Sequence, residues 1–113
     1  QAFTPPGDFM TVLRSMLALH LDRLDLNVDY VARLFGISRQ SLQRTLKANG
    51  TTLMKEIAVL KKNRACDDLA KTHKTISEIA TALGFGSAVS FTRAFKTWTG
   101  QSPSDFRRNP KGT

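Results

Sequence analysis

The 113-residue chain lacks the features that mark export, membrane insertion or covalent cross-linking. A single cysteine, Cys66, cannot form an internal disulfide, which predicts an intracellular protein. No stretch of 18 consecutive apolar residues is present and the start carries no signal peptide, so we expect no membrane span and no membrane partner. The sequence begins at Gln1 rather than Met, which predicts a piece of a longer chain or a processed product.

The residue patterns of common catalytic and metal sites are also missing. The two histidines, His20 and His73, stand far apart without cysteines or carboxylates at ligand spacing, so no metal site is expected. Nothing arranges Ser, His and Asp as a triad, and no phosphate-binding or dinucleotide-binding glycine motif occurs. Cys66 is expected to be structural, with a redox role left open. The sequence therefore predicts no enzyme and no cofactor.

Acidic residues are scarce. Nine Asp and Glu face 17 Lys and Arg, which gives a formal net charge of +8 and a pI near 10.3. Such a charge favours a polyanionic partner, either nucleic acid or a membrane surface, and charge alone does not choose between them. The 41% hydrophobic content is sufficient for a packed core.

The period-two alternation of β-strands is absent, and the apolar residues recur at helical spacing. The chain is predicted to be all-α, with about seven helices. Capping residues and glycine stops place them at about 8–24, 28–35, 38–48, 52–70, 75–83, 87–98 and 102–107. We expect residues 1–7 to be a linker or tail and residues 109–113 a second tail. The remaining boundaries are a first subdomain over 8–50, a linker helix within 51–71 and a second subdomain over 72–108.

An internal repeat is the main clue to function. At an offset of 48 residues Ala32 aligns with Ala80 and Gly36 with Gly84, while an offset of 49 aligns the capping residues Ser38 and Ser87. One extra residue in the second turn accounts for the slip. The pattern in each copy predicts a helix, a tight turn at the glycine and a second helix. The small Ala is expected where the two helices cross. This is the pattern of a DNA-binding helix-turn-helix, although an ordinary helical hairpin also uses Ala and Gly.

The second helix of each copy has an apolar face and an opposite face free to enter a groove. At 100° per residue, the free face of the first copy holds Gln40, Gln43, Arg44 and Lys47, and that of the second holds Val89, Thr92, Arg93 and Lys96. Arg can pair with guanine and Gln with adenine in the major groove, and the methyls of Val and Thr suit thymine. A plain solvated face is the alternative for either stripe.

The linker helix sets the separation of the two copies. About 18 residues at about 1.5 Å each span roughly 27 Å, which can hold two reading helices about one DNA turn apart. Where the match is imperfect the DNA must bend, and we predict bending.

The stretch from about Val28 to Arg107 resembles the DNA-binding domain of AraC/XylS-type bacterial transcription regulators. The resemblance rests on Ile76-Ser77-Glu78-Ile79-Ala80, Gly84-Phe85, Ser87, Phe91, Arg93, Phe95-Lys96, Gly100, Ser102-Pro103 and Phe106-Arg107, and in the first half on Ala32, Gly36, Ser38, Leu42, Arg44, Leu46 and Gly50. It covers about 80 of the 113 residues.

The resemblance implies two helix-turn-helix units that bind promoter DNA in adjacent major grooves. It also implies transcription activation through RNA polymerase, in the bacterial cytoplasm at the nucleoid. An effector-binding or dimerisation domain before Gln1 is a further expectation. The base-reading positions implied are Gln40, Gln43, Arg44, Ala88, Val89, Thr92 and Arg93, of which Ala88 comes from the resemblance alone.

Phosphate contacts are expected from basic residues beside these faces and near helix N-termini, namely Arg39, Lys47, Lys55 and Lys96. Lys61, Lys62 and Lys74 fit a plain solvated charge equally well. The alternative function is a basic protein-interaction module that docks an acidic partner such as a polymerase subunit, with a membrane-surface helix as a weaker third.

Overall fold

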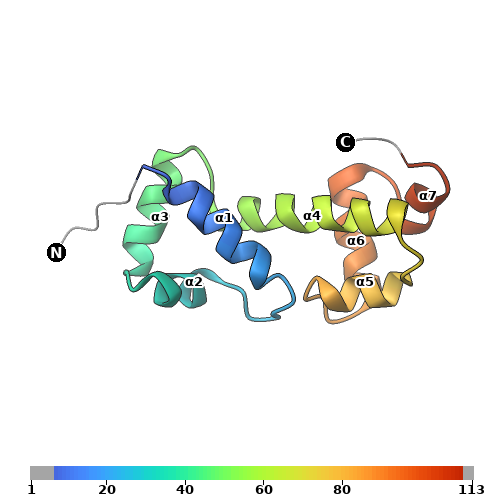
Figure 1. The fold of residues 1–113 in the computed structure, drawn as a ribbon, viewed down its shortest axis with the longest axis horizontal. Helices are drawn as coiled ribbons and strands as arrows, with labels where there is room; N and C mark the ends of the chain where they lie inside the picture. Colours follow the sequence, from blue (N-terminus) through green and yellow to red (C-terminus); the bar gives the residue numbers. More distant parts are fainter. Residues whose placement is uncertain (1–6, 111–113) are drawn as a thin grey trace.

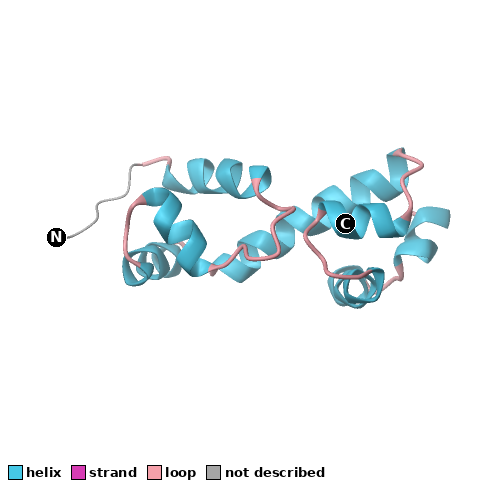
Figure 2. Cartoon of the chain, turned by 90° about the horizontal axis from the view of Figure 1, so that it is seen from below, coloured by secondary structure: helices cyan, strands magenta, loops and turns pink. Residues whose placement is uncertain are grey.

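The computed structural model describes residues 7–110, and within them every regular element is an α-helix. Figure 1 shows two groups of helices at the ends of one long helix, and Figure 2 shows helices and loops alone. The all-α prediction is confirmed. The helices are α1 (Phe9–Leu19), α2 (Val28–Phe35), α3 (Arg39–Ala48), α4 (Leu53–Lys71), α5 (Ile76–Ala82), α6 (Ala88–Thr99) and α7 (Pro103–Arg108). The tails predicted over 1–7 and 109–113 lie almost entirely outside the described residues.

Most helices begin where a polar side chain satisfies a free backbone N–H group. The side-chain oxygen of the residue before the helix accepts from a backbone N–H in the first turn in six cases: Asn27, Ser38, Thr52, Thr75, Ser87 and Ser102. Thr75 and Glu78 form the reciprocal pair of a capping box, as the sequence predicted. These local bonds explain why sequence patterns located the starts of α2 to α7 to within a residue or two.

The first helix is shorter than predicted. The expected helix runs to Leu24, but α1 ends at Leu19 and residues 20–26 form turns. Leu21 is buried, at 2% exposure, whereas Leu24 is 76% exposed. The ring of Tyr30 on α2 holds this turn, since it packs edge-on against His20 and lies 4.3 Å from the guanidinium carbon of Arg23. Tertiary contacts to α2 therefore outweigh the helical periodicity that continues to Leu24.

The long helix α4 carries one continuous hydrophobic core from the first group of helices to the second. Its N-terminal half buries Leu53 and Ile57 against the first unit, defined as α1–α3, and its C-terminal half buries Ala65 and Leu69 against the second unit, defined as α5–α7. The first unit buries mainly aliphatic side chains around one aromatic pair, Phe9 and Phe35, whose ring centroids lie 5.2 Å apart, and the second unit buries largely aromatic ones. The fully buried side chains include Leu13, Leu17, Val31, Leu42 and Leu46 in the first unit and Ile79, Leu83, Phe91 and Phe95 in the second.

Both ends of α4 are also tied by polar contacts. Near its start, Glu56 accepts from Arg14 Nε at 2.7 Å and from Thr51 Oγ1 at 2.8 Å. At its end, the guanidinium of Arg107 donates to carbonyl oxygens of the last turn, with Nε 3.0 Å from the Leu69 oxygen. Free C-terminal carbonyls of a helix need such donors. Side chains of α1 and α7 thereby clamp the helix that joins the units.

The carboxyl of Glu56 makes this clamp sensitive to acid. The hydrogen bond from Arg14 lowers the pKa of Glu56 below its ordinary value of 4.5, and partial burial opposes that shift without cancelling it. A carboxyl whose pKa is lowered by folding stabilises the fold above its unfolded pKa, and that stability is lost as the pH falls through the folded pKa.

We predict that Glu56→Gln reduces the loss of stability between about pH 5 and pH 3, because the titrating group is removed. Urea unfolding over that pH range measures the effect. Arg14→Met removes the main partner of Glu56 and is expected to flatten the same part of the profile. An acid slope in Glu56→Gln equal to that of the unchanged chain would contradict the assignment.

Candidate nucleic-acid interface

The two helix-turn-helix turns have the same backbone geometry. Gly36 and Gly84 are left-handed, with φ of 67° and 79°. The N–H of the next residue, Ile37 or Phe85, donates to the carbonyl of Ala32 or Ala80 at 3.0 Å. Both alanines are buried where the helices of each pair cross. The repeat in the sequence is thus a repeat of hydrogen bonds and of close helix packing.

Helix α3 presents a polar face to solvent. Its opposite face buries Leu42, Thr45 and Leu46. The predicted base-reading residues Gln40, Gln43 and Arg44 and the predicted phosphate contact Lys47 are all exposed. Among residues 7–110 no acidic side chain pairs with Arg44 or Lys47. These groups are available to an incoming ligand, as the sequence predicted, while their roles toward DNA remain predictions.

Helix α6 carries the second face, and its residues gather around one depression. Ala88, Val89, Thr92, Arg93 and Lys96 together line a shallow hollow of about 390 Å³. Val89 is 66% exposed, while Ala88 and Thr92 are half-buried. Arg93 and Lys96 are exposed. The side chains of the second face are therefore more apolar than those of the first, and they line a shallow hollow.

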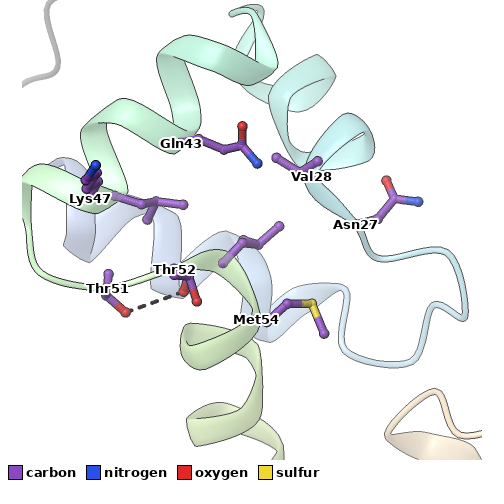
Figure 3. Close-up of a pocket in the computed structure, with 9 residues that line it drawn as sticks. Asn27, Val28, Gln43, Lys47, Thr51, Thr52 and Met54 are labelled. Carbon is purple, nitrogen blue, oxygen red and sulfur yellow. Dashed lines mark hydrogen bonds between the residues drawn. The ribbon is translucent and has the colours of Figure 1, made fainter.

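A cleft of about 580 Å³ adjoins the face of α3, between the starts of α2 and α4 (Figure 3). Gln43 and Lys47 line it from α3, with the Gln43 side chain pointing toward Val28, and Val28 and Met54 line it from α2 and α4. The remaining lining residues are Asn27, Leu46, Thr51, Thr52 and Leu53. Its walls are largely apolar, and the two capping residues Asn27 and Thr52 mark helix N-termini at its edge. The sequence patterns did not reveal this cleft, because its residues come from three separate segments.

The predicted phosphate contacts differ in their surroundings. Lys55 lies in the first turn of α4, where its backbone N–H donates to Thr52 Oγ1, and its side chain is exposed. Arg39 lies 3.6 Å from Asp29 of α2, and both side chains are more than half exposed. Sequence reasoning missed this pairing, since Asp29 is ten positions away and meets Arg39 only through the turn. A phosphate would compete with Asp29 for Arg39.

Lys61 and Lys74 are not plain solvated charges. Lys61 Nζ lies 4.7 Å from the ring centroid of Phe85, and burial lowers the pKa of its ammonium group. Lys74 lies 3.7 Å from Asp68. The sequence does not indicate these contacts. Lys61 meets Phe85 of the turn in the second unit, and Lys74 meets Asp68 of the preceding helix α4.

Other chemistry finds no support in the described part of the chain. Residues 7–110 contain no group of three or more His, Cys, Asp and Glu side chains placed to hold a metal ion. In the same range no helix is long and apolar enough to cross a membrane. Cys66 is half-buried, and burial raises the pKa of its thiol, which disfavours the reactive thiolate.

Comparison with known proteins identifies the class. A family model described as a helix-turn-helix domain matches residues 31–109, which is more than half of the chain. The C-terminal domain of AraT, a response regulator from Geobacillus stearothermophilus, superposes with a TM-score of 0.83 at 27% identity, covering 91% of this chain and 86% of that one. An AraC-type transcriptional regulator from Chromobacterium violaceum superposes with a TM-score of 0.75 at 30% identity, covering 89% and 93%.

Two curated relatives align with most of this chain. The ornithine utilization regulator of Pseudomonas aeruginosa is 39% identical over 104 residues, which cover 92% of this chain and 30% of the regulator. The Tn10 TetD protein of Escherichia coli is 38% identical over 102 residues, which cover 88% of this chain and 74% of TetD. The chain thus spans less than a third of the first relative and about three quarters of the second.

The fold and its two exposed helix faces define a helix-turn-helix DNA-binding protein. More specifically, the chain belongs to the AraC-type family of transcription regulators. The resemblance stated from the sequence is confirmed.

We predict that Asp29→Asn strengthens binding to every duplex by roughly two- to fivefold, because it frees Arg39 for a phosphate. Binding measured at two salt concentrations should also show a steeper salt dependence. The control is Asp67→Asn, which removes another exposed acid, one that pairs with Lys71 at 3.5 Å. Equal gains in both variants would indicate an effect of net charge alone.

Proposed function

We propose that this chain binds double-stranded promoter DNA sequence-specifically, with α3 and α6 in adjacent major grooves. The observation that carries the proposal is the pair of exposed side-chain faces on α3 and α6. These helices belong to the two groups that one continuous helix, α4, joins (Figure 1). Helix α4 has 19 residues and so spans about 28 Å at about 1.5 Å per residue. With the width of the flanking helices this approaches the roughly 34 Å of one DNA turn.

The two faces are suited to different base edges. In α3, Arg44 can donate two hydrogen bonds to guanine, and Gln40 and Gln43 can pair with adenine. In α6, Arg93 supplies the same guanine contact. Ala88, Val89 and Thr92 offer methyl groups to thymine. We infer that the first unit discriminates mainly by hydrogen bonds and the second by shape and apolar contact around Arg93, since its hollow is lined largely by small or apolar groups.

Phosphate contacts would hold both helices in register. Lys47 and Lys96 flank the two reading faces, and Lys55 and Arg39 lie in the first turns of α4 and α3. A lysine or arginine there adds to the partial positive charge of the helix N-terminus. Where the two faces do not match straight DNA, the duplex bends toward them, at a cost of roughly 1–6 kcal/mol.

Within the cell, we propose regulation of transcription by activation, through contact of the DNA-bound chain with RNA polymerase. The support is family membership, together with the net charge of +8, which suits an acidic partner. Any effector-binding or dimerisation domain is a separate proposal, supported by the greater length of the ornithine utilization regulator.

Selection of bound duplexes from a random DNA pool near physiological salt tests this function. We expect two enriched blocks about one helical turn apart. A single enriched block would show that α6 mainly contacts the DNA phosphate backbone. No enrichment, with binding no tighter than to heparin, would contradict base reading and favour the protein-interaction alternative.

Point variants distinguish base-specific contacts from phosphate contacts. Arg44→Ala and Arg93→Ala are each expected to cost about 1–3 kcal/mol on the selected duplex and to relax the preference at one base pair. Lys55→Ala should weaken binding to all sequences alike. It should also reduce the slope of the logarithm of the binding constant against the logarithm of salt concentration by about one, because one phosphate contact is lost. Competition binding against a panel of single-base substitutions measures both effects. Equal losses on every duplex for the arginine variants would overturn their assignment as base readers.

A further inference from the structure

The two units touch each other directly, away from α4. The turn that follows α1 approaches the turn between α5 and α6 (Figure 1). A Cβ atom placed on Gly84 would lie 2.6 Å from the carbonyl oxygen of Leu21 and 2.8 Å from that of Arg23. Both distances are shorter than real Cβ contacts. The bare Cα of Gly84 is therefore what permits the two backbones to meet.

The equivalent glycine of the first unit shows that this closeness is not a requirement of the turn itself. Gly36 has φ of 67°, close to the 79° of Gly84, and ends α2 with the same hydrogen bonds. A Cβ on Gly36 would meet nothing within 4 Å. Both positions favour glycine for their left-handed backbone. Gly84 alone needs glycine for a second reason, the contact with residues 21–23.

Each side of this contact is anchored in its own unit. Leu21 is buried in the core, and Arg23 is held by the ring of Tyr30 and by Asp25, whose Oδ1 lies 2.8 Å from Arg23 Nε. On the other side Leu83, next to Gly84, is fully buried. A displacement at the contact would therefore move whole units rather than a loose loop.

We propose that the contact between Gly84 and residues 21–23, called here the inter-unit contact, sets the orientation of α6 relative to α3 and thereby the spacing of the two DNA blocks that the chain reads. A single connecting helix can bend and twist, as long helices commonly do. A second contact beside α4 removes that freedom. If the inter-unit contact opened to admit a methyl group on residue 84, the turn would shift by somewhat less than one ångström. The part of this inference that concerns DNA spacing rests on the function proposed above.

The orientation can be measured without DNA. Spin labels at Ala48 of α3 and Ser104 of α7, in a Cys66→Ala background, report the distance between the units by pulsed electron spin resonance. Both labelled positions are exposed. We expect Gly84→Ala to shift or broaden the distance distribution. Gly36→Ala, which suffers the same left-handed strain without a clash, should leave it unchanged.

A second variant keeps the test independent of turn strain. Inserting one glycine after Asp22 lengthens the exposed turn and leaves both helix-turn-helix turns intact, and surface turns tolerate such insertions. We expect the same broadening as in Gly84→Ala. If Gly84→Ala fails to fold, the insertion decides the question. Distributions equal to that of the unchanged chain in the variants that fold would overturn the proposal.

The DNA consequence has its own readout. Binding is compared between the selected duplex and a duplex with one extra base pair between the two blocks. The unchanged chain and Gly36→Ala should both bind the selected duplex more tightly. In Gly84→Ala and the insertion variant this preference should fall roughly tenfold. A preserved preference despite an altered distance would overturn the claim about spacing. If the unchanged chain selects no sequence at all, the proposed function fails, and the distance measurement alone decides the role of the contact in orientation.

Discussion

The architecture depends on the sharing of α4 between the two units, whose buried side chains form one continuous core. Each unit has three short helices, too few to bury its apolar faces alone, because small domains bury a small fraction of their surface. The two halves of α4 complete them, with Leu53 and Ile57 on one side and Ala65 and Leu69 on the other. One rigid helix therefore stabilises both units and also fixes how far apart their exposed faces stand. Stability and the geometry of recognition arise from the same packing.

The two units are alike in backbone and different in surface. The turns, caps and buried alanines repeat, while the first reading face is polar and the second is a shallow hollow around Val89. Such a pair suits an asymmetric site, since a symmetric one would need two equal faces. The second unit also buries more aromatic side chains than the first, because the backbone pattern repeats while the side chains do not.

Much of the structure could be predicted from the sequence, for local reasons. Caps such as Ser38 and Ser87 and the stops at Gly36 and Gly100 act within a turn of the chain, so their patterns locate the helices. The exposed stripes followed from helical periodicity. The prediction that the first helix reaches Leu24 was wrong, because a distant ring, that of Tyr30, determines where the chain turns.

By itself the sequence determined the class of fold, the repeat and the residues on each exposed helix face, since all of these depend on interactions within a few residues or on periodicity. Only the tertiary structure decided the pairing of Arg39 with Asp29, the capping of α4 by Arg107 and the meeting of Gly84 with residues 21–23. These contacts join segments that lie far apart in the chain or on different elements. Their geometry depends on how whole helices pack, which no local pattern contains.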